Sequence, residues 1–592
     1  MRRLAGRTVA IVVVVLVAAL TYPGAIVVSV VDRLIPSIRP AALTVPPGGL
    51  DWLHVEHPGG RTPFIADQEG RMVLLHGAIP TGLIDFWSGS DQKETDPLPY
   101  YPIDPAAYKD GGCPANSSLI ATPPLCRWDI LEMAALGFNS IRLPLSWSLL
   151  EPERGQFSDR YIDRVAQVVG WARDSGMYVI LDMHQDAYSR HVGRADPSPL
   201  PGGSPPNLRY YDGAPAWATF TDGMPSEWYS GQREVNPAVF EAATNFWYNR
   251  AGIQDEYIAT VARVVDRFKG DSTVAGIDLY NEPWPGWNLS PGFEDLLLYP
   301  FYRRVIDAIT GLHDGIPCPT HVFMPAACGY PDLGVHDIQQ LVFLDTGIPR
   351  EITDFPTHLG LPVSSYPNLV LGIHAYTHIY TPDHLLSPST RPQDASYPWG
   401  GYDQSYWWGE REARALGAAL FVSEFGNDLK WDTEELHNQL LEEQRHLTGF
   451  AFWTWKENCG GNGTWGIFDG IDCGHAEPQP SMGCVRQLRA QLLAGVYPEA
   501  SSDPNLTYSY DRKSGSFTLQ ATGRSGDPPT VVVVPADVTG SITAGGAVTG
   551  EPSIQQYGEG RTVTVYPSGG SYTVNVTPAP LTPFPCAVSS LQ

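Results

Sequence analysis

Two glutamates, Glu282 and Glu424, each follow a short apolar run. Their carboxylates could act as acid, base or nucleophile in catalysis. The runs cover residues 276–280 and 418–422, are too short for helices and are punctuated by glycine or proline, so we predict two buried strands. A carboxylate at the exit of a buried strand is poorly placed for packing and well placed to face a cavity. Two carboxylates across a cleft can hydrolyse a glycosidic bond, one as proton donor and the other as nucleophile or base.

Other polar and aromatic residues end or interrupt predicted strands in the same way. They are Arg142, His184, Asp186, Asn281, His374, Tyr376, Trp453 and Lys456, and we predict all eight as substrate-binding residues. An arginine inside an apolar strand is costly unless paired, so we expect Arg142 to contact Glu424 and to keep that carboxylate ionised. We expect Asn281 to bind a sugar hydroxyl and Trp453 to present a flat surface to a sugar ring.

Each of these residues also has a structural interpretation. Either glutamate alone is compatible with a buried structural carboxylate, and His184 with a hydrogen-bonded core histidine. Lys456 is compatible with a surface lysine whose stem packs on apolar atoms. A metal site built from His184, Asp186 and His374 is conceivable, but two-carboxylate hydrolysis requires no metal. We therefore predict neither a metal ion nor a cofactor.

Apolar runs alternate with amphipathic stretches through most of the chain. Strands are predicted at residues 72–78, 139–143, 178–183, 274–279, 322–325, 369–374, 420–424 and 450–455, with helices at residues 159–175, 254–268 and 432–446 among others. Eight strands alternating with helices predict an α/β fold, a (β/α)8 TIM barrel whose C-terminal strand ends carry the chemistry. An open doubly wound sheet is the alternative.

The residue pattern of the sequence changes after residue 497. Short β-branched runs separated by turn residues follow, at residues 517–521, 530–534, 562–566 and 571–576. This pattern predicts a small antiparallel β-sandwich. We therefore expect a catalytic barrel over residues 61–497 and a sandwich domain over residues 498–592.

The N-terminus has the pattern of an export segment. Three arginines within the first seven residues precede an apolar stretch over residues 9–31, interrupted at Pro23. A stretch that ends near this proline suits a secretory signal, and one that continues suits a membrane anchor, so residues 1–34 are predicted as one or the other. Residues 35–60 are rich in proline and glycine and are expected to form a linker. In both cases we predict that the body of the protein is exported, either secreted or anchored to the cell membrane.

Cysteine content and charge are consistent with export. In an exported chain the eight cysteines are most simply four disulfides, and the pairs that suggest themselves are Cys113 with Cys126, Cys318 with Cys328, Cys459 with Cys473 and Cys484 with Cys586. No CxxC spacing favours a structural zinc site. The net charge of −26 repels nucleic acid, so no nucleic-acid partner is expected.

On these residues, the chain resembles glycoside hydrolase family 5 and, within it, the endoglycosylceramidases. The matching stretches are residues 181–189, 213–219, 245–247, 280–283 and 423–426. The resemblance implies a barrel with a C-terminal β-sandwich and retaining cleavage between the reducing-end sugar of a glycosphingolipid and its ceramide. It also implies that Glu282 is the acid/base and Glu424 the nucleophile, with Asp186, Asn281 and Tyr376 holding the sugar or supporting catalysis.

Three alternatives remain open from the sequence. In the first alternative, the substrate is a glycoside of a different lipid, such as a sterol glucoside. In the second, the protein is a β-glucanase or β-mannanase that cleaves a polysaccharide. The third alternative is a catalytically silent glycan-binding protein of the cell surface. We expect a monomer that meets a glycolipid substrate at a membrane surface.

Overall fold

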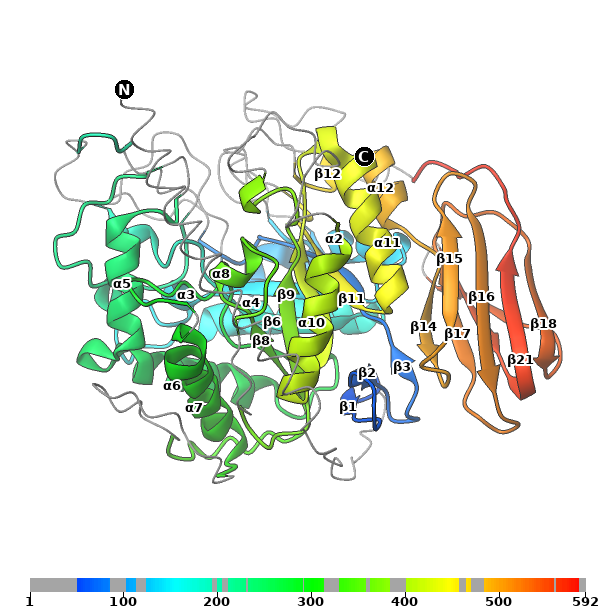
Figure 1. The fold of residues 1–592 in the computed structure, drawn as a ribbon, viewed down its shortest axis with the longest axis horizontal. Coiled ribbons are helices and arrows are strands. Elements are labelled where there is room, and N and C mark those ends of the chain that lie inside the picture. Colours follow the sequence, from blue (N-terminus) through cyan, green and yellow to red (C-terminus); the bar gives the residue numbers. More distant parts are fainter. Residues whose placement is uncertain are drawn as a thin grey trace.

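A closed barrel of eight parallel strands lies at the centre of the molecule, and an antiparallel sandwich lies against one side of it (Figure 1). The structure is a computed structural model that describes residues 50–85, 103–112, 124–193, 200–204, 211–229, 233–290, 292–313, 330–357, 363–383, 401–456, 465–469, 484–557 and 560–584. The predicted fold class is therefore confirmed.

The barrel strands are short, fully or almost fully buried and in parallel register. In chain order they are β4 (His76–Ile79), β5 (Ser140–Ser146), β6 (Tyr178–His184), β7 (Val274–Asp278), β8 (Leu341–Asp345), β9 (Leu369–His374), β10 (Ala419–Phe425) and β11 (Gly449–Trp453). Strands buried on both faces read as continuous apolar runs, which is why most of them could be located in the sequence.

Two of the predicted strands differ from the structure. The fifth barrel strand is β8 and not residues 322–325, which lie outside the described residues. Both segments are short apolar runs, and such runs cannot be ranked by periodicity. The first predicted strand, residues 72–78, is divided between two sheets: Met72–Val73 forms β3 of the sandwich, and the barrel strand β4 begins at His76.

Helices surround the barrel. Those in the described ranges are α2 (Arg127–Ala135), α3 (Trp147–Leu150), α4 (Asp159–Asp174), α5 (Pro237–Trp247), α6 (Ile253–Phe268), α7 (Tyr299–Thr310), α8 (Ile348–Glu351), α10 (Asp403–Leu416), α11 (His437–His446) and α12 (Gln487–Leu493). Capping side chains define where two of these helices begin. The Ser158 hydroxyl accepts a hydrogen bond from the Tyr161 amide at the start of α4, and the Asn236 side chain accepts one from the Ala238 amide at the start of α5.

Short segments of 3-10 or π-helix lie in the connections. The 3-10 turns are η1 (Pro105–Gly111), η2 (Arg190–Val192), η4 (Ala216–Ala218), η5 (Arg250–Gly252) and η8 (Leu429–Trp431), and the π turns are η6 (Glu294–Leu298) and η9 (Asp432–Leu436). A small hairpin pairs β12 (Phe468–Asp469) with β13 (Cys484–Val485). Several of these turns lie in the connections at the C-terminal ends of barrel strands, the end that carries chemistry in this fold.

Two antiparallel sheets form the sandwich. One contains β1 (His54–Glu56), β2 (Phe64–Ala66), β3, β14 (Tyr497–Ser501), β17 (Thr530–Val534), β20 (Gly560–Val565) and β19 (Ser553–Tyr557), and the other contains β15 (Thr507–Asp511), β16 (Ser516–Gly523), β21 (Pro567–Val576) and β18 (Ile542–Val548). Side chains alternate between buried and exposed along β16, and its buried residues pack on valines of β17 and β20.

The sandwich contains strands from both ends of the described chain. Strand β1 lies within the segment expected as a linker, and β3 pairs with β14, so one sheet joins the regions before and after the barrel. The Asn139 side chain, next to barrel strand β5, donates hydrogen bonds to the Leu74 carbonyl (2.9 Å) and to Glu499 Oε1 (3.2 Å) of the sandwich. These contacts attach the sandwich to the side of the barrel.

The predicted export segment lies outside the described residues. Within the described ranges, no helix is long and apolar enough to cross a membrane. Cys126 is disulfide-bonded. Every predicted pairing includes at least one cysteine outside the described residues, so the four pairings stay predictions.

Candidate active site

Glu282 and Glu424 lie at the C-terminal ends of barrel strands. Glu282 follows β7 in a turn with φ of 44°, and the Gln185 side chain donates hydrogen bonds to the carbonyl oxygens of Asn281 (2.7 Å) and Glu282 (2.9 Å). Glu424 is within β10, whose register shifts between Val422 and Glu424 so that Glu424 pairs with His374 of β9. The two carboxylates predicted from the sequence are thus brought to the same end of the barrel.

The Glu424 carboxylate is buried and has two hydrogen-bond donors. The Tyr376 hydroxyl donates to Oε1 (2.8 Å), and Arg142 Nη1 donates to Oε2 (3.1 Å). The predicted contact between Arg142 and Glu424 is therefore present. Burial raises the pKa of Glu424 to about 7, the positive charges of His374 and Arg142 oppose this rise, and the charge of Glu282 adds to it.

Arg142 connects Glu424 to three buried aspartates that the sequence analysis did not single out. Its Nη2 lies 2.9 Å from Asp278, 3.1 Å from Asp345 and 3.2 Å from Asp182. Each aspartate lies in an apolar barrel strand, as Arg142 does, and this shared anomaly was the available signal. Although burial opposes it, these carboxylates hold the pKa of Arg142 well above its usual value.

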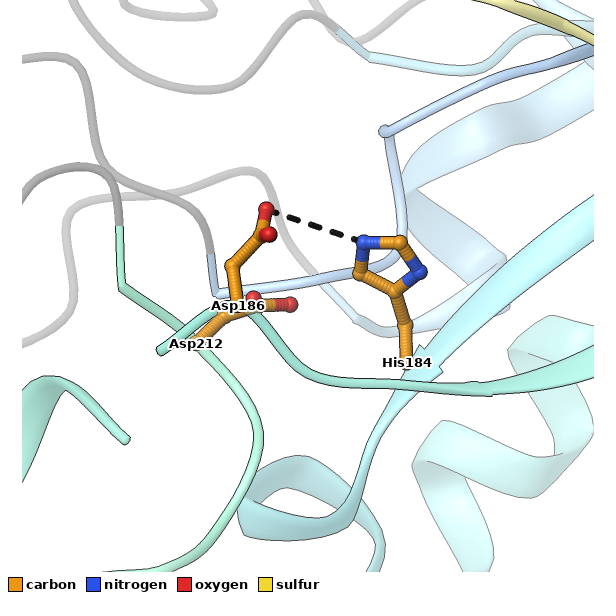
Figure 2. A group of neighbouring side chains, drawn as sticks. All are labelled: His184, Asp186 and Asp212. Atoms are coloured by element: carbon orange, nitrogen blue, oxygen red, sulfur yellow. Dashed lines mark ion pairs between the residues drawn. The ribbon is translucent and has the colours of Figure 1, made fainter. Parts of the chain in front are cut away.

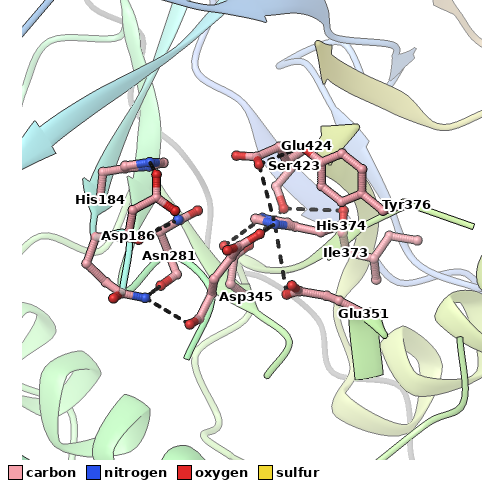
Figure 3. A network of polar contacts seen from close by, with 12 residues as sticks. His184, Asp186, Asn281, Asp345, Glu351, Ile373, His374, Tyr376, Ser423 and Glu424 are labelled. Carbon is pink, nitrogen blue, oxygen red and sulfur yellow. Dashed lines mark hydrogen bonds and ion pairs between the residues drawn. The ribbon is translucent and has the colours of Figure 1, made fainter. Parts of the chain in front are cut away.

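His374 lies close to both candidate catalytic carboxylates. Figure 3 shows it beside Glu424, Asp345 and Glu351. Its Nδ1 is 2.9 Å from Glu282 Oε1 and 4.0 Å from Glu424 Oε1, and its Nε2 is 3.0 Å from Asp345 Oδ2. Burial alone would lower the pKa of His374, but the carboxylates of Asp345 and Glu424 hold it well above the usual value. His374 is therefore an imidazolium at neutral pH.

Glu351 of α8 is a further buried carboxyl beside this pair. Its Oε1 is 3.9 Å from His374 Nδ1 and has no hydrogen-bond partner in the structure. Burial raises the pKa of Glu351 well above its ordinary value, and the nearby charge of Glu282 raises it further. Glu351 could not be found from the sequence, because it lies in a short helix and not at a strand end.

A second polar cluster begins at the end of β6. His184 Nδ1 is 2.7 Å from Asp182 Oδ2, and its Nε2 is 3.8 Å from Asp186 Oδ2. Asp212, which the sequence analysis missed, completes the cluster from the following loop, with both carboxylate oxygens buried and without a hydrogen-bond partner (Figure 2). Trp453 of β11 stacks on His184 with ring centroids 5.4 Å apart. Asp182 contacts both Arg142 and His184, so the two clusters are continuous.

Arg233 pairs with one carboxylate of this second cluster. Its Nη2 donates a hydrogen bond to Asp186 Oδ1 and, against the effect of burial, lowers the pKa of that carboxyl. Burial raises the pKa of Asp212 well above its ordinary value. One atom each of His184, Asp186 and Asp212 lie within 4.8 Å of one another, and so do those of Glu282, Glu351 and His374. Sugar hydroxyls or a divalent cation fit such donor sets.

Lys456, predicted as a substrate-binding residue, does not join the other predicted site residues. Its buried Nζ is 2.5 Å from Asp129 Oδ1 of α2 and lies over the rings of Trp128 and Phe468, at 4.1 and 4.8 Å. The neighbouring Trp455 donates its indole hydrogen to the same carboxylate oxygen (2.8 Å). The chain turns away from the barrel mouth after Trp453, so the ammonium pairs with an outer helix.

The other predicted residues meet in the two clusters. Arg142, Asn281, His374 and Tyr376 surround the glutamates, whereas His184, Asp186 and Trp453 form the adjoining wall. The Asn281 side chain accepts a hydrogen bond from Arg142 (2.8 Å) and donates one to the Gln185 carbonyl (3.0 Å). An amide nitrogen carries two hydrogens, so the second remains for a substrate.

Comparison with known proteins places this chain in a family. Residues 128–459, more than half of the chain, match the family described as cellulase (glycosyl hydrolase family 5). The chain therefore belongs to glycosyl hydrolase family 5, and it is a glycosidase.

Within the family, the chain is similar to proteins named as endoglycoceramidases or endogalactoceramidase. Endoglycoceramidase I of Rhodococcus hoagii (strain 103S) is 25% identical over 542 residues, which cover 86% of each chain. The crystal structure of endogalactoceramidase has a TM-score of 0.66 and 27% identity, and covers 89% of this chain and 100% of that one. Endo-glycoceramidase II from Rhodococcus sp., in complex with ganglioside GM3, has a TM-score of 0.63 at 23% identity and covers 87% and 99% of the two chains. The expected likeness to endoglycosylceramidases is thus confirmed.

Proposed function

We propose that this chain is a retaining glycosidase that cleaves the bond between the glycan and the ceramide of glycosphingolipids. The observation that carries the proposal is the pair Glu282 and Glu424, linked through His374 at one end of the barrel. The lipid part of the proposal is supported by the likeness to endoglycoceramidase I along most of both chains.

The proposed reaction has two steps. In the first, Glu424 attacks the anomeric carbon, the bond from that carbon to the ceramide oxygen breaks, and Glu282 gives its proton to that oxygen. In the second, Glu282 takes a proton from water, the water oxygen attacks the same carbon, and the bond to Glu424 breaks. The sugar leaves with its anomeric configuration retained.

The surroundings of the two carboxylates fit different roles. The hydrogen bonds from Tyr376 and Arg142 stabilise Glu424 as a carboxylate, the form that attacks. Glu282 is the more exposed of the two, with 15% of its side chain accessible against 7% for Glu424. We assign Asn281 and the His184, Asp186 and Trp453 wall to sugar binding.

Export is the setting that we propose for this activity. The disulfide at Cys126 supports it, since disulfides persist in oxidising compartments. A secreted or membrane-anchored enzyme would meet glycosphingolipids at a membrane surface.

Product analysis tests the proposed substrate. The purified protein is incubated in detergent with glucosylceramide, galactosylceramide, lactosylceramide, a ganglioside, a sterol glucoside and a soluble β-glucan, and product masses are measured. The Glu424→Gln variant is the matched inactive control. Release of intact glycan together with ceramide is the expected result. Cleavage of only the sterol glucoside or only the glucan would contradict the ceramide assignment, and no turnover of any substrate would contradict the catalytic proposal.

A further inference from the structure

Apolar side chains are exposed on the segment that leaves β7 beyond Glu282. Leu289 is 71% accessible and Trp287 is 51% accessible, and Tyr248 at the end of α5 is also exposed. The Tyr248 hydroxyl donates a hydrogen bond to the Asn288 side chain (2.8 Å), which places the ring beside the segment. We call Trp287, Leu289 and Tyr248 the apolar rim.

The apolar rim is held rigidly. Gly286 has a φ of +64°, and a Cβ atom there would lie 2.3 Å from Thr244 Oγ1, so the backbone is pressed against α5. The next amide, of Trp287, donates a hydrogen bond to that same Oγ1 (2.9 Å). The indole ring stacks on Phe240 with centroids 4.8 Å apart and an interplanar angle of 26°. Trp287 is therefore presented to solvent by a fixed backbone.

The exposed surface of Trp287 is apolar. The polar atom of the indole, Nε1, donates a hydrogen bond to Glu241 Oε2 (2.8 Å), so its hydrogen-bonding capacity is used within the protein. Exposed leucine together with a tryptophan that has one polar and one apolar side is typical of contact with a membrane interface.

The position of the apolar rim suggests what it contacts. Trp287 and Leu289 are five and seven residues beyond Glu282, the group that we assign to protonate the leaving oxygen. The segment leaves the C-terminal end of β7, so it lies at the same end of the barrel as the two glutamates. The chain carries a net charge of −26, which opposes binding to an anionic surface and favours a zwitterionic one.

We propose that the apolar rim docks the protein onto a zwitterionic lipid bilayer, with Trp287 and Leu289 inserted among the headgroups. The inference rests on the proposed function, since a lipid-bearing substrate gives the docking its purpose. Docking would bring the mouth of the barrel to a membrane-embedded glycolipid.

Hydroxyl-radical footprinting tests the docking without any substrate. The full chain is oxidised with and without phosphatidylcholine vesicles that contain no glycolipid, and modification of individual tryptophans is measured by mass spectrometry. Trp407 of α10, which is 40% accessible, is the internal control. We expect vesicles to slow oxidation of Trp287 severalfold and to leave Trp407 unchanged. Equal oxidation of Trp287 with and without vesicles, or equal protection of both tryptophans, would overturn the proposal.

A second measurement separates docking from catalysis. The rates of Trp287→Ser, Leu289→Ser and the control Trp407→Ser are compared on glycolipid in vesicles and on the same glycolipid in detergent. Loss of one inserted leucine corresponds to about tenfold weaker partitioning or more, so the vesicle rate should fall by a similar factor with Leu289→Ser. The detergent rate should stay unchanged. Equal rates of all variants on vesicles would contradict docking, whereas a wild-type protein inactive in both formats would contradict the proposed function alone.

Discussion

Nδ1 of His374 lies 2.9 Å from Oε1 of Glu282, while its Nε2 faces the carboxylate of Asp345. The carboxylates of Asp345 and Glu424 favour the imidazolium form of the ring, whose Nδ1 hydrogen is donated to Glu282. The same Nδ1 is 4.0 Å from Glu424 Oε1, so one positive charge is shared by the two candidate catalytic groups. When the proposed reaction neutralises Glu424 and ionises Glu282, this charge is already in place for the new carboxylate.

Removal of either catalytic carboxylate should abolish turnover of glycolipid. We expect Glu282→Gln and Glu424→Gln each to lower kcat/KM by about a thousandfold or more, which corresponds to a barrier increase of about 4 kcal/mol. A dinitrophenyl glycoside needs no protonation of its leaving group, so Glu282→Gln should retain the first step with it and Glu424→Gln should not. Steady-state and burst kinetics on both substrates measure this difference. Either variant within about tenfold of wild type on glycolipid would refute its assignment.

The raised pKa of Glu424 predicts the acidic side of the pH profile. The attacking form is the carboxylate, and its pKa is about 7, so kcat/KM should rise with pH up to about pH 7 and fall about tenfold per unit below it. Tyr376→Phe removes a donor to the carboxylate, so this limb should move to higher pH. A profile whose acidic limb does not move in Tyr376→Phe would contradict the role given to this hydrogen bond.

Glu351 is expected to act as a neutral acid. Its folded-state pKa is raised, so it favours the folded state at low pH, and this contribution is lost as the pH rises through the raised value. Glutamine mimics the protonated form. Glu351→Gln should therefore keep kcat/KM within about tenfold of the wild-type value near neutral pH. The Tm of the variant minus the Tm of wild type should increase between pH 5 and pH 8.

Glu443 provides a matched control for this variant. It is a buried carboxyl of α11 whose pKa burial also raises, and its neighbour is Tyr406, away from the two glutamates. Glu443→Gln should show the same trend of Tm with pH and no change in the pH profile of kcat/KM. If the Tm difference between Glu351→Gln and wild type shrank as the pH rose, Glu351 would be ionised in the folded protein.

Lys456 is predicted to matter for stability and not for substrate binding. Lys456→Met leaves the buried Asp129 without its cation, and the loss of one partner of a buried pair costs about 3 kcal/mol of unfolding free energy. We expect a lower Tm with KM unchanged. Lys430, an exposed lysine 3.9 Å from Asp428, is the control, and Lys430→Met should change the Tm little. A higher KM for Lys456→Met at unchanged Tm would show that Lys456 takes part in substrate binding.

The sequence was informative at several positions where an ionisable residue interrupts or ends an apolar strand, although Asp182, Asp278 and Asp345 share this feature and were not singled out. Glu282, Glu424, Arg142 and His374 could be found because a buried strand gives such residues few explanations besides a partner or a cavity. Asp212 and Glu351 could not, because they lie in a loop and a short helix, where polar residues are ordinary. Only the fold brings them to the site.

The errors in the sequence analysis also have physical reasons. The position of β8 was missed because two short apolar runs compete in that region, and the choice between them depends on barrel closure. The contact of Lys456 with Asp129 was not foreseen because the predicted strand continued past Trp453, where β11 ends. The sharing of one sandwich sheet by β3 and β14 involves residues far apart in sequence, which no local pattern reports.

The most direct test of the account is to trap its covalent intermediate. The protein is incubated with an activated 2-deoxy-2-fluoro glycoside of the sugar released in the product analysis, digested, and the labelled peptide is sequenced by mass spectrometry. A fluorosugar attached to Glu424, with none on the Glu424→Gln variant, is the predicted result. A label on Glu282 or on another residue, or no label together with release of sugar of inverted configuration, would contradict the proposed mechanism.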